Sequence, residues 1–244
     1  MKKIKNYIIA YFSYRKDLKE LIKQKGSNNL FPFGKKRLIL NEKFADSGIA
    51  SGHYFHQDLL VARKIFQHNP QKHVDIGSRT DGFVAHVATF REIEVFDIRE
   101  QNKKIKNINF KKADLTKLPT ELIAYTDSIS SLHAIEHFGL GRYNDSIDYW
   151  GYLKAIENIT TILKTGGKFY FSTPIGQQRI EFNAHRVFNI QYLMDLFKEK
   201  YNIHSFSYVN DAGDLFENIE LSEESIKNNL GCHYGCGIFE LIKK

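Results

Sequence analysis

The chain has 244 residues, 42% of them hydrophobic and 14% aromatic, which is ample for a sizeable core. Two cysteines are too few for a disulfide framework, and no apolar run approaches the roughly 20 residues of a membrane-spanning helix. The net charge of +7 is compatible with an anionic ligand. The lysines are spread along the chain, so nucleic acid is a less favoured partner.

Residues 2–24 place apolar side chains such as Ile4, Ile8 and Ile22 at helical spacing, with lysines and arginines between them. This pattern predicts a basic amphipathic helix. Docking on the chain's own domain is its simplest role, and peripheral contact with a membrane surface or a partner is the alternative. The apolar run at residues 8–12 is too short and polar-flanked for a secretory signal, so we expect a cytoplasmic protein.

Residues 1–45 are thus predicted to form an N-terminal helix and loop, and residues 46–244 a single α/β domain. Glycine and serine at 48–52 break regular structure, and His53, Tyr54 and His56 follow before a predicted helix at 57–67. We expect these three side chains to form a substrate loop. A metal pair made by the two histidines is less favoured, because their spacing recurs by chance.

A short apolar strand at 73–76 runs into a polar turn between Gly77 and Gly82 that opens a helix. Glycine lets a ligand approach the backbone where a side chain would block it. The motif is not GxGxxG, so by itself it is a weak signal. Its candidate cofactor-binding residues are Asp75, Gly77, Ser78 and Arg79.

Two more strands, at 92–97 and 107–111, are each followed by an acidic residue. Asp97 lies 20 positions after Gly77, the separation at which a βαβ unit presents a carboxylate to ribose hydroxyls. Asp114 follows the third strand and is a candidate partner for an adenine amino group.

After a helix predicted at 118–125 and a strand at 127–132 comes a cluster of ionisable residues, His133, Glu136 and His137. Ligands of a doubly wound sheet bind at the carboxyl ends of its strands, so this cluster is expected beside Gly77 and Asp97. HxxEH also matches an inverted zinc-protease motif. That alternative is poor, because Gly139 and Gly141 end the helix after about one turn.

A helix at 149–163, a Lys-Thr-Gly-Gly stop and a strand at 168–173 complete a recognisable pattern. A helix at 191–200 and strands at 201–209 and 237–242 are predicted to follow. Arg179, His185 and Arg186 come directly after the fifth strand, where a substrate is expected to lie. Cys232 and Cys236 do not make a zinc site without a second cysteine pair, so we expect no metal.

Taken together, Asp75-Ile-Gly77, Asp97, Ala113-Asp-Leu115, the Leu-His-Ala-Ile-Glu-His run ending at His137 and the Lys-Thr-Gly-Gly turn resemble the class I S-adenosylmethionine-dependent methyltransferases. The segments GHYFHQD, DIGSRTDGF, LHAIEHFGLGRY and FNAHRVF look most like an uncharacterised group of methyltransferase-like proteins. The resemblance implies a Rossmann-like, seven-stranded sheet with helices on both faces, after an N-terminal helical extension. It also implies S-adenosylmethionine as cofactor, S-adenosylhomocysteine as product, and Leu115 and His133 as further cofactor contacts.

The resemblance names no substrate, and the chain has Arg79 and Asp81 where the family usually has glycine. His137 is the first candidate for a general base, before Glu136 and His133. Arg142, Arg179 and Arg186 predict an acceptor with phosphate or carboxylate, because guanidinium groups suit both. We therefore expect methylation of an oxygen on a small anionic, sugar-type acceptor. The alternatives are an inactive scaffold with the same fold and, less favoured, an RNA methyltransferase.

Overall fold

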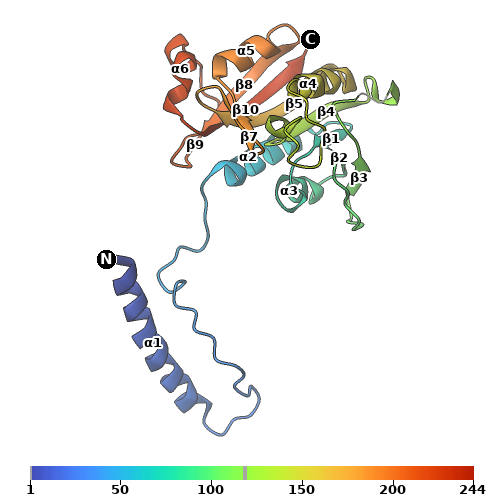
Figure 1. Cartoon of the computed structure of the whole chain (residues 1–244). Helices are drawn as coiled ribbons and strands as arrows, with labels where there is room; N and C mark the ends of the chain where they lie inside the picture. The colour runs from blue at the N-terminus through green and yellow to red at the C-terminus, as the bar shows by residue number, and fades with distance from the viewer. Residues whose placement is uncertain (1, 118–119) are drawn as a thin grey trace. The chain divides into compact units, whose positions relative to one another are not determined.

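The computed structural model describes residues 2–117 and 120–244. They form two compact units, Met1–Ala50 and Ser51–Lys244 (Figure 1). The first unit contains the helix α1 (Lys2–Lys25) and a stretch without regular strands, joined by an ion pair of 2.8 Å between Lys43 Nζ and Asp17 Oδ2. The predicted N-terminal helix is therefore present. Within residues 2–117 and 120–244, no helix combines the length and the apolar character needed to cross a membrane.

The second unit is organised around one eight-stranded sheet in the order β3-β2-β1-β4-β5-β10-β8-β9. Its strands are β1 (His73–Ile76), β2 (Ile93–Asp97), β3 (Ile108–Lys112), β4 (Thr126–Leu132), β5 (Leu163–Ile175), β8 (Tyr201–Val209), β9 (Leu215–Phe216) and β10 (Gly235–Lys243). The first five are parallel, and β10 lies antiparallel between β5 and β8. Two short strands, β6 (Arg179–Glu181) and β7 (His185–Val187), form a separate hairpin. The predicted Rossmann-like sheet is confirmed, with the two-residue β9 as an added edge.

Helices cover both faces of the sheet (Figure 1). The helices are α2 (His53–His68), α3 (Ala85–Ala88), α4 (Gly151–Ile162), α5 (Ile190–Phe197) and the short α6 (Glu223–Lys227), with a π-helical turn at Thr80–Val84 and 3-10 turns at Thr120–Leu122, Ile135–His137 and Asn229–Gly231. One core cluster packs α2 and α3 against residues such as Val95 and Tyr170. The other packs α4 and α5 against Phe169, Phe171 and Phe239. Cover from helices on both faces explains why the central strands are largely buried, and β1 and β4 bury polar side chains there as well, among them His73, Asp75 and Ser130.

Two local predictions were wrong. The residues expected to form a substrate loop, from His53 to His56, are instead the first turn of α2, which begins immediately after Gly52 at φ +89°. Apolar residues recur from Leu60 to Ile65 at helical spacing, and Gln57 and Asp58 are buried with them, so packing extends the helix toward its start. The helix expected at 118–125 is only a 3-10 turn at Thr120–Leu122, while residues 118–119 lie outside the described part of the chain.

Candidate functional site

A pocket of about 520 Å³ opens at the carboxyl ends of the first four parallel strands. Its lining comes from residues 77–81 after β1, from 96–101 at the end of β2, and from Phe110 and 113–116 in and after β3. The loop after β4 contributes residues 133–134, 137–139, 142–143 and 145, and α2 contributes Tyr54. Loops that follow neighbouring parallel strands meet at one edge of a sheet, which is where ligands of such folds bind. Its volume suits a small-molecule ligand.

The turn after β1 depends on Gly77 and Asp75. Gly77 has φ +73°, and a Cβ there would approach the Cβ of Ala134 to 3.1 Å. Asp75 is completely buried beneath the turn, where its carboxylate accepts hydrogen bonds from Ser78 N (2.9 Å), Ser78 Oγ (2.7 Å) and Ser130 Oγ (2.6 Å). Burial raises the pKa of Asp75 to about 7, although these donors act in the opposite direction. Asp75 does not line the pocket, so it shapes the turn, and Ser78 faces the cavity.

The two residues that replace the usual glycines pair with each other. Arg79 Nε and Nη2 donate to Asp81 at 3.0 and 2.8 Å, and both side chains are exposed at the pocket mouth. The Arg79 guanidinium lies 5.8 Å from the Tyr54 ring centroid. Arg79 and Tyr54 both line the cavity, and the Arg79 guanidinium is already paired with the Asp81 carboxylate.

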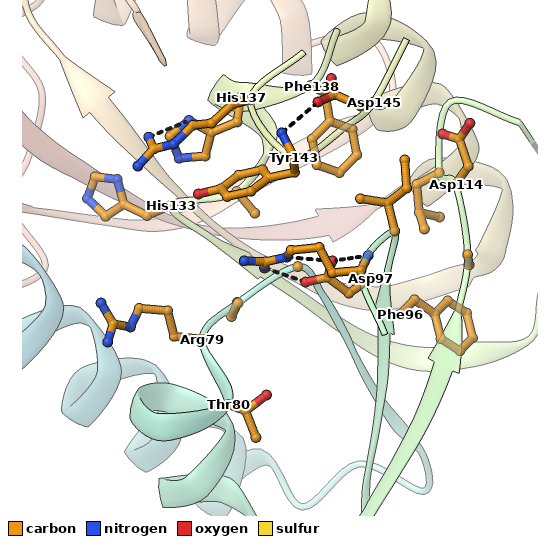
Figure 2. A pocket seen from close by; sticks show the side chains of 18 of the residues that line it. Arg79, Thr80, Phe96, Asp97, Asp114, His133, His137, Phe138, Tyr143 and Asp145 are labelled. Atoms are coloured by element: carbon orange, nitrogen blue, oxygen red, sulfur yellow. Dashed lines mark hydrogen bonds and ion pairs between the residues drawn. The ribbon is translucent and has the colours of Figure 1, made fainter. Parts of the chain in front are cut away.

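Asp97 and Asp114 form what we call the carboxylate end of the pocket, on the right in Figure 2. The Asp97 carboxylate is nearly buried and accepts three hydrogen bonds from Arg99, from its backbone N (2.8 Å), Nε (3.0 Å) and Nη2 (2.5 Å). Each carboxylate oxygen has two acceptor positions, so Oδ1 is filled by the two donors from Arg99 N and Nε, while Oδ2 keeps one position for a ribose hydroxyl. The Asp114 side chain, 30% exposed, accepts from Thr116 N (3.0 Å) and Oγ1 (2.7 Å). Leu115 lies beside it as apolar lining.

His133 and His137 form the histidine end, on the left in Figure 2. The Nδ1 of His137 lies 2.6 Å from the Ala184 carbonyl oxygen. Only a protonated Nδ1 can donate there, so the neutral ring keeps an unprotonated Nε2. Burial lowers the pKa of His137 below its usual value, which keeps the ring neutral at pH 7. His137 therefore has the protonation state that a general base needs.

Glu136 is buried and does not line the pocket. Its Oε1 accepts from His133 Nδ1 at 2.7 Å and lies 3.8 Å from His137 Nε2. Burial raises the pKa of Glu136, but the interactions with His133 and His137 and a backbone hydrogen bond together outweigh it, and the net shift is downward. Glu136 is thus an ionised carboxylate that holds His133 in place, and it does not meet a ligand in the pocket.

Five of the expected substrate contacts do not line the pocket: His53, His56, Arg179, His185 and Arg186. Arg186 is 4% exposed and donates to the carbonyls of Glu136 (3.3 Å), Phe138 (2.7 Å) and Tyr149 (3.1 Å). Its guanidinium therefore fixes the loop after β4. Arg179 is bonded to Glu181 at 2.9 Å and to the carbonyls of Gln177 and His233.

Arg142 does line the pocket. It donates to the Ala184 carbonyl at 3.0 Å and lies near His137 Nδ1 at 3.4 Å. Within residues 2–117 and 120–244, no carboxylate forms an ion pair with Arg142, whereas Arg79 and Arg99 each have one. Arg142 is therefore the pocket arginine best placed to meet an anionic ligand.

Several pocket residues were missed from the sequence. Arg99 bridges Asp97 to the Tyr143 ring, with its guanidinium 4.4 Å from the ring centroid. Asp145 accepts from the backbone N of Gly139 (2.8 Å), Gly141 (3.2 Å) and Tyr143 (3.1 Å), and so holds the loop that carries Arg142. The signal for Asp145 was available, since an aspartate after two glycines commonly organises a turn. Nothing local predicted that Tyr143 would face Arg99.

The fold is shared with solved methyltransferase structures. A 1,6-didemethyltoxoflavin-N1-methyltransferase from Burkholderia thailandensis, solved with its substrate and S-adenosylhomocysteine, matches with a TM-score of 0.54 and 13% identity, over 82% of this chain and 93% of that one. The N-methyltransferase NodS from Bradyrhizobium japonicum, solved with S-adenosylhomocysteine, matches with a TM-score of 0.51 and 13% identity, over 79% of this chain and 88% of that one. The [4+2]-cyclase SpnF matches with a TM-score of 0.54 and 12% identity, over 77% of this chain and 80% of that one. The second unit thus has the class I methyltransferase fold, and the cyclase shows that this fold supports more than one reaction.

Residues 71–231 match a family described as "Caenorhabditis protein of unknown function, DUF268", and the chain belongs to that family. The matched region includes β1 to β5, all of the pocket lining except Tyr54, and the β6–β7 hairpin. No curated protein matches the sequence.

Proposed function

We propose that this protein is an S-adenosylmethionine-dependent methyltransferase that methylates an oxygen of a small anionic acceptor. The observation that carries the proposal is that one pocket brings together the Gly77 turn, Asp97, Asp114 and the histidine end. Gly77 lines the pocket in a left-handed backbone conformation, and the two carboxylates lie at the carboxyl ends of adjacent strands. Solved relatives with this fold hold S-adenosylhomocysteine, which supports the assignment of the cofactor.

The residues of the pocket fit that cofactor. Asp97 would accept a ribose hydroxyl at Oδ2, and Asp114 the adenine amino group, with Phe96 and Leu115 as apolar lining. The sulfonium supplies the methyl group together with a good leaving group. The protein's part is then to orient the acceptor and remove its proton.

His137 is the base that this arrangement favours. Its unprotonated Nε2 would take the proton of the acceptor hydroxyl as the oxygen forms its bond to the methyl carbon. Arg142, adjacent to His137, would bind the phosphate or carboxylate of the acceptor. A sugar-type acceptor supplies both a hydroxyl and, when phosphorylated, an anion.

Calorimetric titration with S-adenosylhomocysteine tests the cofactor assignment first. Binding to wild-type protein, followed by methyl transfer to an acceptor from a panel of hydroxylated phosphates and carboxylates, would support the proposal. A folded protein without affinity for the cofactor would contradict it and favour the inactive scaffold. Tight and strongly salt-dependent binding of RNA would instead favour an RNA methyltransferase.

We also propose that α1 lies against an anionic membrane surface in the cytoplasm. Residues 1–50 carry twelve lysines and arginines against four acidic residues, a net charge of +8, so the remaining residues sum to −1. Ile4, Ile8 and Phe12 on α1 are 51 to 69% exposed. A basic helix with exposed apolar side chains suits a membrane interface.

Co-sedimentation with vesicles tests this second proposal. Vesicles with anionic lipid should bind the full chain in a salt-sensitive way, and neutral vesicles should bind it weakly. Replacing Lys16, Lys19 and Lys23 by glutamate should abolish the binding. Equal binding to both kinds of vesicle, or none to the anionic ones, would contradict the proposal and favour docking on the chain's own domain.

A further inference from the structure

Three side chains of metal-binding type converge beside the histidine end of the pocket. They are His53 at the start of α2, His133 after β4 and Cys236 in β10. One nitrogen from each histidine and the Cys236 Sγ all lie within 4.8 Å of one another. Cys236 is completely buried and His133 nearly so, while His53 is partly buried. The two histidines and the cysteine come from segments far apart in the sequence, so only the folded chain brings these nitrogen and sulfur atoms together.

The His133 ring has one nitrogen without a partner. Its Nδ1 lies 2.7 Å from Glu136 Oε1, but its buried Nε2 has no hydrogen-bond partner within residues 2–117 and 120–244. Buried polar atoms nearly always have a partner, so the exception requires an explanation. The His133 side chain is only 4% exposed, so bulk solvent does not supply that partner. His133 belongs to the same group as Cys236 and His53, and a group of this kind could hold a metal ion.

Glu136 has the position of a residue that supports a metal ligand. Metal-binding histidines almost always donate the other ring N–H to a carboxylate, a carbonyl or water, which fixes the ring and leaves the remaining nitrogen for the metal. The Glu136 contact at His133 Nδ1 leaves His133 Nε2 as the free nitrogen in this way. The backbone of His133 has φ +50°, a conformation that residues other than glycine seldom adopt and that is concentrated at functional sites.

We propose that His53, His133 and Cys236 bind one Zn²⁺ ion, with Glu136 orienting the His133 ring. Two imidazoles and a thiolate match the borderline-soft character of zinc better than that of Mg²⁺ or Ca²⁺. Tetrahedral zinc places nitrogen and sulfur ligands about 3.5 Å apart, so the three atoms, now within 4.8 Å of one another, would approach by up to about 1 Å on binding. The His53 ring is stacked on that of His133 with centroids 5.1 Å apart, so it would have to turn to direct a nitrogen at the ion.

The second cysteine provides a matched control. Cys232 belongs to the core cluster on the opposite face of the sheet from Cys236, and it is not a member of the ligand group. Both cysteines are buried and reduced. A metal site made of His53, His133 and Cys236 therefore distinguishes two cysteines that are only four residues apart in the sequence.

The test measures metal directly on the full chain. Protein purified without chelators should contain one zinc per chain by elemental analysis, and apoprotein should take up one Zn²⁺ in competition with a chromophoric chelator. Cobalt in place of zinc should give a thiolate-to-metal charge-transfer band. Cys236→Ser should abolish that band, and Glu136→Gln should weaken zinc binding about 10- to 100-fold. Cys232→Ser should retain the band and the affinity.

Three results would overturn the proposal. They are wild-type chain that takes up no zinc, Cys236→Ser with unchanged zinc affinity, and equal losses in Cys232→Ser and Cys236→Ser. The wild-type measurement decides the matter even where a variant fails to fold, which circular dichroism would reveal. The site does not depend on methyl transfer: S-adenosylhomocysteine titrated into the same samples can fail to bind while zinc still binds, or the reverse.

Discussion

At the carboxylate end of the pocket, each acidic side chain is held by a residue that follows it closely in the chain. Asp97 is bonded to Arg99 and Asp114 to Thr116, both two positions later. At the histidine end, His133 and Glu136 are close in the chain, but two further contacts join segments more than forty residues apart: His137 donates to Ala184, and Arg186 to Phe138. The first end is a local structure repeated after successive strands. The second exists only when the loop after β4, the β6–β7 hairpin, α2 and β10 have assembled.

The two ends also differ in how completely their polar atoms are bonded. The carboxylates of Asp97 and Asp114 both have protein donors. Near the histidine end, His133 Nε2 and Glu136 Oε2 are buried without partners among the described residues. We infer that the carboxylate end is preformed for the proposed cofactor, whereas the histidine end is specialised for chemistry particular to this protein.

The sharpest way to separate the two ends is His137→Ala. Removing a general base usually lowers kcat by about 100-fold or more, and cofactor affinity should stay near wild type because His137 makes no hydrogen bond or ion pair with Asp97 or Asp114 among the described residues. Activity of the wild type should also fall as pH drops through a pKa lying below 6.5, since burial lowers the pKa of His137 and protonation removes the base. Single-turnover kinetics from pH 5 to 8 would measure both effects.

His204→Ala is the matched control, since His204 is an exposed histidine on β8, outside the pocket. It should leave kcat and the pH profile unchanged. If His137→Ala kept full activity, the ring would be a packing residue and the base would lie elsewhere.

Arg186→Ala should break the histidine end by loss of structure. The substitution leaves the carbonyls of Glu136, Phe138 and Tyr149 without their buried donor, which costs roughly 2 to 4 kcal/mol of unfolding free energy. Urea denaturation would show a lower midpoint with an unchanged slope. Wild-type stability combined with a raised acceptor KM would contradict this and return Arg186 to a direct role in acceptor binding.

Asp97→Ala tests the carboxylate end. Loss of a charged hydrogen-bonded pair should cost about 1.5 to 3 kcal/mol, or roughly ten- to a hundredfold in the dissociation constant for S-adenosylhomocysteine. The affinity for adenosine should fall in parallel, because adenosine and S-adenosylhomocysteine carry the same ribose. Calorimetry on the folded variant provides the measurement. Unchanged affinity for both ligands would contradict the assignment of the cofactor to this pocket and, with it, the proposed methyl transfer.

Asp114→Ala should have the smallest effect, a loss of less than about tenfold in S-adenosylhomocysteine affinity. The side chain is partly exposed, and water can replace part of an adenine amino contact. The same titration measures it. A loss larger than that of Asp97→Ala would reverse the assignment of ribose and adenine to the two carboxylates.

The sequence alone determined where the parallel strands follow one another along the chain, the position of the Gly77 turn and the placement of Asp97 and Asp114 at strand ends, because each depends on spacing within one strand-loop-helix unit. It also predicted that His133, Glu136 and His137 would lie at the same edge. Short-range sequence patterns predict where each strand ends and where the glycine turns lie. Parallel strands then bring their carboxyl ends together at one edge of the sheet.

Only the tertiary structure decided which of these side chains are available. The carbonyl of Ala184 fixes the tautomer of His137, three distant carbonyls occupy Arg186, and Cys236 lies beside His133 while Cys232 faces the other core. A sequence pattern specifies which face a residue takes, but not which residue from a distant segment will pack against it. Long-range packing therefore decides which polar atoms at the histidine end are occupied and which are left free for a ligand.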